Sequence, residues 1–308
     1  MSKFKLTTFA VQCALMLEKI SIFFNNLILT IISKIRIIVL SRFFIKFHKE
    51  AGQPDECVIL GNGPSLNFTV DKHRSFLENR ALVCVNHFAE TDLYQQLKPK
   101  IYVLGAPEMW LNDVEDFYYN KGERLFTEIA SQTKWKMSLY IHSSAYKSKR
   151  WQEKIKSNPD ITVKYYNPTP VEGFRWFKNL CFRLNLGMPR PHNVLIPSIM
   201  ITLNSSFRVI YLAGADHSWL KDVNVNDYNE VLLSQRHFYD EQNPGTRPMD
   251  KLGKGSRHLH EVLLKWVYSF RGYFDLSDYS KTLQKKIINI TPGSYIDAFE
   301  RINLDKIS

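Results

Sequence analysis

Downstream of residue 56, apolar residues fall in short runs that are separated by polar, glycine- and proline-containing segments. A short apolar run bounded by turn residues is typical of a strand buried on both faces, whereas apolar positions at helical spacing indicate a helix. The pattern predicts strands at 57–60, 81–88, 99–106, 136–143, 161–167, 207–216 and 286–294, a buried helix at 193–206 and an amphipathic helix at 258–270. This alternation predicts an α/β fold, a Rossmann-like and mostly parallel sheet with helices on both faces. We expect 57–60 and 207–213 to be parallel neighbours.

The first fifty residues follow a different pattern. Residues 20–49 are strongly apolar, but they are interrupted by Asn25, Asn26, Lys34, Arg36 and Arg42. The segment falls short of the about 20 consecutive apolar residues of a spanning helix, and its interleaved charges differ from those of a cleavable signal. We expect residues 1–50 to form a basic amphipathic helical segment on an anionic membrane surface, peripheral on the inner, cytoplasmic face of the cell membrane. The alternative is a helix packed on the protein's own core.

The rest of the chain, 51–308, is predicted to form one α/β domain that begins with a linker at 51–56. The composition, with 308 residues, 44% hydrophobic and 23% charged, is typical of a globular protein. The segment 224–255 is too polar for a core, so we expect a lid or acceptor loop whose order depends on ligand. The cysteines lack the spacing of a zinc site and are typical of a reducing compartment; they are Cys13, Cys57, Cys84 and Cys181.

The formal net charge of +11 suits nucleic acid, an anionic membrane or an anionic substrate as partner. In residues 1–50, eight basic side chains stand against two acidic ones, so part of the excess belongs to the N-terminal segment. The chain has no recognisable RNA- or DNA-binding motif, and we therefore expect no nucleic-acid partner.

A single turn, CVILGNGPSL at 57–66, carries the first candidate chemistry. Gly61 and Gly63 permit a sharp turn and the close approach of a ligand, and Pro64 and Ser65 suit the start of a helix, whose free N–H groups favour phosphate. The turn lacks the third glycine of a dinucleotide-binding loop and the Gly-Lys-Ser/Thr of a P-loop. An ordinary strand-to-helix turn remains the alternative.

Polar residues and glycines also follow the other predicted strands, at the edge where ligands bind in parallel sheets. These residues are Asn86 and His87, Gly105 to Glu108, Gly214, Asp216, His217, Ser218 and Trp219, and Thr291 to Ser294. Asp216 has a second possible role, because an aspartate after a strand commonly caps the next turn.

The stretches ILGNGPSL, CVNHF and VIYLAGAD together resemble the bacterial sialyltransferases of glycosyltransferase family 42 over about residues 55–302. They are also similar to an uncharacterised family from bacterial surface-polysaccharide clusters that is related to archaeal 6-hydroxymethylpterin diphosphokinases. The resemblance implies a nucleotide-sugar-binding domain at 51–308. It implies that CMP-sialic acid is bound by Asn62, Gly63, Ser65 and Asn86, with Arg190 and Asn193 as the nearest counterparts of further contacts.

Two positions depart from the sialyltransferase pattern. The two tyrosines that hold the leaving phosphate in that family should follow the Gly-x-Asp strand, where this chain has His217, Ser218 and Trp219 and offers Tyr239 only later. The family's catalytic histidine aligns with Lys254, although His260 follows closely. The enzyme class therefore carries over better than the identity of the sugar.

Transfer from a CMP-sugar needs a base for the acceptor hydroxyl, and an imidazole is suited to that. We rank His260 first, His217 second and His237, which lies beside Tyr239, third. Arg190 is a candidate partner for a carboxylate or phosphate. No Asp-x-Asp is present, so we expect a metal-independent reaction without a cofactor.

The predicted function is transfer of a sialic-acid-like sugar, a nonulosonic acid or Kdo, from a CMP-activated donor to a surface glycan or lipid-linked oligosaccharide acceptor. One alternative is a magnesium-dependent pterin diphosphokinase, which needs a carboxylate cluster for ATP. Another is a non-catalytic basic protein that binds nucleic acid or membrane.

Overall fold

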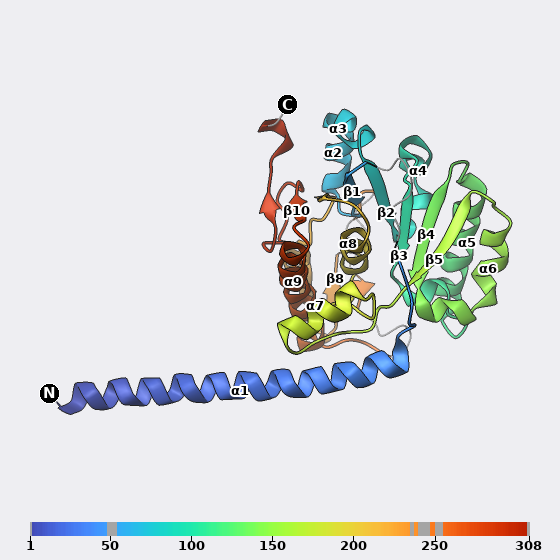
Figure 1. The fold of residues 1–308 in the computed structure, drawn as a ribbon. Helices are drawn as coiled ribbons and strands as arrows, with labels where there is room; N and C mark the ends of the chain where they lie inside the picture. Colours follow the sequence, from blue (N-terminus) through green and yellow to red (C-terminus); the bar gives the residue numbers. More distant parts are fainter. Residues whose placement is uncertain (1, 48–53, 235–236, 240–246, 250–254, 307–308) are drawn as a thin grey trace.

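The computed structural model describes residues 2–47, 54–234, 237–239, 247–249 and 255–306. It confirms the α/β fold, because an eight-stranded parallel sheet is surrounded by helices (Figure 1). The strand order is β11-β10-β6-β1-β2-β3-β4-β5. The strands are β1 (Glu56–Leu60), β2 (Ala81–Val85), β3 (Ile101–Leu104), β4 (Met137–His142), β5 (Ile161–Tyr166), β6 (Val209–Ala213), β10 (Lys286–Asn289) and β11 (Glu300–Arg301).

Every predicted strand coincides with one of these strands, and the predicted pairing is confirmed as well. Strand β1 lies parallel to β6, with Cys57 opposite Ile210 and Leu60 opposite Ala213. Since β1 also pairs with β2, the chain order of the strands reverses between β1 and β6. In open α/β sheets, ligands bind beyond the carboxyl ends of the strands at such a reversal.

The helices form two layers that cover opposite faces of the sheet. Alternate residues of β1 divide between the two cores, with Cys57 and Ile59 on one side and Val58 and Leu60 on the other. The first core is covered by α7 (Arg175–Arg183), α8 (Leu195–Asn204) and α9 (Leu259–Thr282). The second is covered by α2 (Ser65–Lys72), α3 (Arg74–Glu78), α4 (Asp92–Leu97), α5 (Asp116–Gln132) and α6 (Lys149–Lys156).

The predicted buried helix and amphipathic helix correspond to α8 and α9. Residues 195–203 of α8 are all buried, which explains its almost uninterrupted apolar sequence. Helix α9 continues beyond the predicted end at residue 270, to Thr282.

The polar segment after β6 folds more than its composition suggests. It includes a three-stranded antiparallel sheet of β7 (Val223–Val225), β8 (Val231–Leu233) and β9 (Arg247–Pro248). Val231 is buried against Val262 and Trp266 of α9, and Phe238 is buried against Phe88. The expectation that 224–255 contributes nothing to a core was therefore wrong at Val231 and Phe238, because hydrophobic side chains anchor an otherwise polar segment. Residues 235–236, 240–246 and 250–254 lie outside the described residues.

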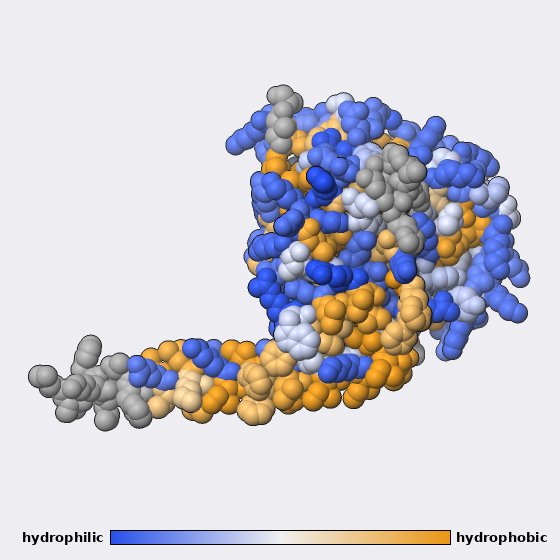
Figure 2. Space-filling model, viewed as in Figure 1, coloured by the Kyte–Doolittle hydropathy of each residue, from blue (hydrophilic) through white to orange (hydrophobic). Residues whose placement is uncertain are grey.

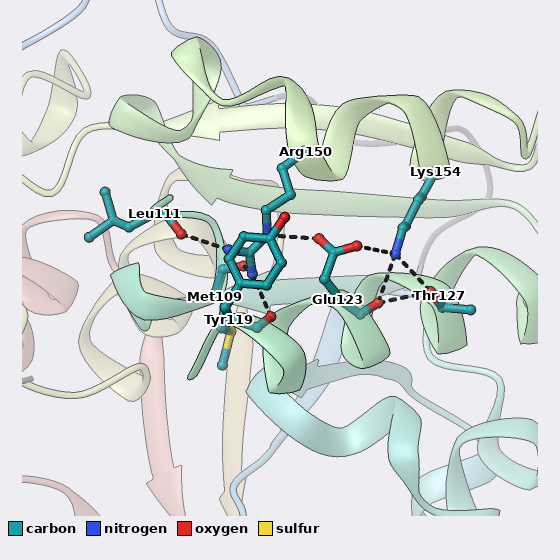
Figure 3. Close-up of polar contacts among 7 residues, drawn as sticks. All are labelled: Met109, Leu111, Tyr119, Glu123, Thr127, Arg150 and Lys154. Atoms are coloured by element: carbon teal, nitrogen blue, oxygen red, sulfur yellow. Dashed lines mark hydrogen bonds and ion pairs between the residues drawn. The ribbon is translucent and has the colours of Figure 1, made fainter. Parts of the chain in front are cut away.

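A buried arginine ties α6 to α5 and to the 3₁₀ helix η2 (Pro107–Met109). Figure 3 shows Arg150 donating to the carbonyl oxygens of Leu111, Met109 and Tyr119 at 2.6, 2.9 and 2.9 Å. Its Nε lies 2.8 Å from the Glu123 carboxylate, which also accepts from Lys154. The Arg150 side chain is only 5% exposed, so these contacts offset the cost of burying its charge.

The N-terminal segment is one long helix, α1 (Ser2–Leu40), whose N-terminal half stands clear of the body (Figure 1). Exposed apolar side chains are consecutive in places, as at 15–17 and 22–24. Consecutive residues lie about 100° apart around a helix, so apolar side chains lie on more than one side of α1, beside the exposed polar residues Glu18, Lys19 and Asn25. The predicted N-terminal helical segment is confirmed as an apolar helix. Among the described residues, one helix, Val11–Leu40, has the length and composition to cross a membrane, a test that buried core helices and signal sequences also pass.

The C-terminal half of α1 packs on the body, as the alternative interpretation required. Ser33 donates to the carbonyl oxygen of Glu172 at 3.1 Å, and Arg36 forms an ion pair with the Glu172 carboxylate at 3.0 Å. A Cβ added at Gly173 would meet Thr30 Oγ1 at 2.1 Å, so the two backbones approach closely. The exposed side of this half remains apolar and continues onto the adjoining surface of the body (Figure 2).

Candidate functional site

A cavity of about 350 Å³ lies where the strand order reverses, beyond the ends of β1, β2 and β6 and beside the start of α8. The structure brings eleven of the predicted site residues together in its wall: Gly61, Asn62, Gly63, Pro64, Asn86, Asn193, Gly214, Asp216, His217, Ser218 and His237. We call this cavity the switch-point pocket.

The glycines of the GNG turn hold two turns together at the base of this pocket. The Gly61 and Gly63 N–H groups donate to the carbonyl oxygens of Ala213 and Gly214 at 2.8 and 2.9 Å. A Cβ at Gly61 would lie 2.4 Å from the Gly214 oxygen, and one at Gly63 would lie 1.9 Å from the Asp216 carboxylate. These glycines are therefore required for packing against the turn after β6, and their N–H groups are already bonded.

The start of α2 is occupied by a carboxylate of the protein itself. Asp216 accepts from the Ser65 hydroxyl at 2.8 Å and from the Ser65 N–H at 3.3 Å. Burial raises the pKa of Asp216, and the two Ser65 hydrogen bonds oppose that rise. Where the sequence predicted a phosphate, the described structure places the Asp216 carboxylate, and Ser65 holds Asp216 from behind the pocket wall.

Asn193 presents a fixed hydrogen-bond donor to the pocket. Its Oδ1 accepts from the Leu195 and Ile196 N–H groups at 3.0 and 3.3 Å, which caps α8, and from the Tyr273 hydroxyl at 3.1 Å. Three donors at Oδ1 determine the orientation of the amide. Its Nδ2 is buried and has no hydrogen-bond partner among the described residues.

Asn62 presents a buried acceptor in the wall of the same pocket. Its Nδ2 reaches the Val85 carbonyl oxygen at 3.5 Å, and its Oδ1 has no partner among the described residues. A buried polar atom left without a partner costs about 1–3 kcal/mol. The switch-point pocket thus holds one donor and one acceptor whose bonding is incomplete without a ligand.

Two further residues of the wall have distinctive backbone or side-chain geometry. Asn86 adopts a left-handed conformation, with φ of 48°, and its Oδ1 accepts from the Gly105 N–H at 3.1 Å. His217 also has a positive φ, of 51°, and its ring packs against Trp219 in a tilted arrangement, with the ring centroids 4.1 Å apart.

The protonation of His217 follows from its surroundings. Its Nε2 lies 2.6 Å from the Tyr273 hydroxyl, which also lies 3.1 Å from Asn193 Oδ1. Burial lowers the pKa of His217 to about 3, so the ring is neutral at physiological pH.

The segment that carries His237 and Tyr239 is attached to the GNG turn. The Phe238 N–H donates to the Asn62 carbonyl oxygen at 3.0 Å, and Asn67 donates to the Phe238 carbonyl oxygen at 2.8 Å. The rings of His237 and Tyr239 stack with centroids 5.0 Å apart. His237 lines the pocket, and Tyr239 supports it from outside the lining.

Two predicted residues lie elsewhere. Arg190 donates to both carboxylate oxygens of Glu172, at 2.9 and 2.7 Å, and its guanidinium lies 4.4 Å from the Tyr268 ring centroid. It therefore belongs to the contact between the body and α1. His260 is exposed in the first turn of α9, stacked beside His258, and does not line the switch-point pocket.

Sequence reasoning missed four charged or hydrogen-bonding residues of this region. Lys221 and Asp222 line the pocket, and Tyr273 orients both Asn193 and His217. Lys265 lines a smaller cavity of about 170 Å³ that shares Asn193 and Trp219 with the switch-point pocket, and burial lowers the pKa of its ammonium group. Lys221 could have been predicted, because it is a basic residue shortly after the end of β6. Tyr273 and Lys265 could not, because they lie on α9, which only the fold brings to the site.

Within the described ranges, no group of three or more His, Cys, Asp or Glu side chains is arranged to hold a metal ion. The four cysteines are free, and three of them are buried in the body.

Comparison with known proteins finds a distant structural likeness. No family model and no curated protein matches the sequence. Among solved structures, the MAf glycosyltransferase from Magnetospirillum magneticum AMB-1 is similar with a TM-score of 0.46 and 11% identity. The match covers 93% of this chain, which spans 39% of the length of that protein. A likeness at this level is too distant to assign a function.

Proposed function

We propose that the protein is a glycosyltransferase that takes a sialic-acid-like sugar, a nonulosonic acid or Kdo, from a CMP-activated donor. The observation that carries the proposal is a pair of buried atoms that have no hydrogen-bond partner among the described residues, Asn62 Oδ1 and Asn193 Nδ2, in a pocket at the reversal of strand order. A ligand with both hydrogen-bond donors and anionic acceptors satisfies both atoms. A nucleoside monophosphate joined to an acidic sugar is such a ligand.

The polar groups of the pocket suggest how the donor is held. Asn193 Nδ2 donates to the phosphate or the sugar carboxylate, and Asn62 Oδ1 accepts from the nucleoside. Because Asp216 occupies the start of α2, the phosphate is expected nearer to α8 and to Lys221 and Lys265. These lysines offset the charge that moves onto the phosphate as the donor breaks.

In the reaction, the acceptor hydroxyl oxygen forms a bond to the anomeric carbon of the sugar as the bond from that carbon to the CMP phosphate breaks. The hydroxyl proton passes to a base. A base works best when its pKa is near the working pH, and the pKa of His217 lies far below it. We therefore favour His237 as the base, with His217 as a neutral residue that positions Asn193 through Tyr273.

The membrane features complete the proposal. Helix α1 attaches the protein to the cytoplasmic face of the cell membrane, where a surface glycan or a lipid-linked oligosaccharide is the acceptor. Its many exposed apolar side chains and its packing on the body support this arrangement.

The test is a calorimetric panel of CMP, UDP, GDP and ATP against the full chain, with and without magnesium. We expect CMP to bind most tightly, with no requirement for magnesium. Binding of ATP with magnesium in preference to CMP would instead favour the diphosphokinase alternative. Failure of all four ligands to bind would remove the support for any nucleotide-dependent enzyme.

A further inference from the structure

A second cavity, of about 650 Å³, lies beyond the carboxyl ends of β3, β4 and β5. Its walls come from the turns after these strands, including Gly105, His142 and Tyr166, and from the end of α1 at Val39, Leu40 and Arg42. We call it the α1-end pocket. Gly105 and Pro107 belong to a strand end that the sequence predicted at the ligand-binding edge, and the other lining residues were not predicted as site residues.

The α1-end pocket carries positive charge without a carboxylate. Arg42 and Lys147 line it, and no Asp or Glu is among its described lining residues. The backbone of Arg42 is fixed by Asn167, which accepts from the Arg42 N–H at 2.8 Å and donates to the Arg42 carbonyl oxygen at 2.7 Å. The guanidinium lies 3.9 Å from the Tyr146 ring centroid and forms no ion pair with a described residue. An arginine held in this way is suited to a phosphate.

The other side of the pocket is apolar and joins the surface of α1. Val39 and Leu40 are 71% and 56% exposed, and Phe43 and Phe44, just beyond, are also exposed. These residues end the helix that has the length and composition to cross a membrane. A ligand that enters from this side meets an apolar surface first and the two cations afterwards.

The α1-end pocket adjoins the switch-point pocket. The Gly105 N–H, at the wall of the first, donates to Asn86, at the wall of the second. His192 lines both the α1-end pocket and the small cavity that shares Asn193 with the switch-point pocket. Ligands in the two pockets would therefore be neighbours.

We propose that the α1-end pocket binds an amphiphilic phosphate ester, with the phosphate at Arg42 and Lys147 and the hydrocarbon chain along Val39 and Leu40. One part of this inference rests on the proposed function, namely that the ester is the acceptor of the transfer reaction. In that case the phosphate group anchors a lipid-linked sugar, and the sugar hydroxyl faces the donor beside Gly105 and His192. Binding of the ester itself does not depend on the identity of the donor.

The experiment uses the full chain in neutral lipid nanodiscs and three probes: hexyl phosphate, inorganic phosphate and hexanol, with empty nanodiscs as the blank. We expect hexyl phosphate to bind at least tenfold more tightly than either single-feature probe. Arg42→Met should weaken hexyl phosphate binding by about 10- to 100-fold, the scale of a lost charged hydrogen bond, and leave CMP binding unchanged. The matched control is Arg208→Met, which removes an exposed charge just before β6, at the amino-terminal ends of the strands and away from both pockets. This variant should change neither hexyl phosphate binding nor CMP binding.

Equal binding of hexyl phosphate and inorganic phosphate would refute the claim that the ligand is amphiphilic. Unchanged hexyl phosphate binding in Arg42→Met would refute the placement of its phosphate at Arg42. If CMP fails to bind but hexyl phosphate binds through Arg42, the proposed function is lost and the α1-end pocket remains. If CMP binds and hexyl phosphate does not, the opposite holds.

Discussion

The side-chain amide of Asn193 offers the sharpest test of the switch-point pocket. In Asn193→Asp, one carboxylate oxygen can replace Oδ1 as the cap of α8 and the acceptor of Tyr273, while the other replaces Nδ2. Aspartate and asparagine are about equally good caps, and negative charge at a helix start is favourable by about 0.3–1 kcal/mol. The variant should therefore fold as stably as the parent, with a melting temperature that is unchanged or slightly higher.

Binding of CMP should respond in the opposite way to this change. A hydrogen bond to a charged group contributes about 1.5–3 kcal/mol, so losing the Nδ2 donor to a phosphate weakens binding by about 10- to 150-fold. Repulsion between the new carboxylate and the phosphate adds to that loss. Calorimetry with CMP and thermal unfolding measure the two effects on the same protein sample.

The matched control is Asn303→Asp, since Asn303 also accepts a backbone N–H, that of Asp305, at 3.0 Å, but lies outside the pocket. Its CMP affinity should equal that of the parent. Parental affinity in Asn193→Asp would refute the assignment of Nδ2 to the nucleotide. A melting temperature lowered by many degrees would refute the assignment of Oδ1 to the helix cap.

Three more predictions concern catalysis, stability and attachment. Asn62→Ala should lower turnover by about 10- to 1,000-fold in a transfer assay, because Asn62 helps to hold the donor in the transition state; parental turnover would remove it from the site. Below pH 6.5 the unfolded chain binds a proton at this histidine, whereas the partly buried His217 of the folded chain, with its pKa of about 3, does not. The free energy of unfolding should therefore fall by about 2 kcal/mol from pH 7 to pH 5 through this residue, and denaturant titrations should show a decline smaller by that amount in His217→Asn; equal slopes would contradict the burial of the ring. Deleting residues 2–22, which leaves the packed half of α1 in place, should reduce sedimentation with anionic vesicles and spare CMP binding, whereas undiminished sedimentation would place the membrane contact elsewhere.

The fold was largely predictable because it depends on local patterns. A strand buried on both faces has few polar positions, and β1 and β6 are unmistakable in the sequence for that reason. The set of strand ends that line the pocket followed from the rule that parallel strands place their carboxyl ends at one edge. Asn193 was found through resemblance alone, and its cap of α8 is visible only in the structure.

The remaining site features could not be predicted because they depend on which atoms are already bonded. From the sequence, the N–H groups of the GNG turn look available to a ligand. In the structure they donate to carbonyl oxygens of the turn after β6, and the Asp216 carboxylate lies where a phosphate was expected. The guanidinium of Arg190 could bind an anionic ligand, but it is already paired with the Glu172 carboxylate. Tyr273 gives no local signal, since it lies 56 residues beyond His217 on a helix that the sheet brings back.

The packing of α1 has a consequence for the synthesis of the protein. Ser33 and the Glu172 carbonyl oxygen that it contacts are 139 residues apart. At ribosomal rates of about 5–20 residues per second, α1 leaves the ribosome roughly 7–28 seconds before its partner segment. During that interval its apolar side chains have no surface of their own domain to cover them. Under the proposed attachment through α1, the helix meets the membrane before the sheet exists, and the body then folds onto a helix that is already attached.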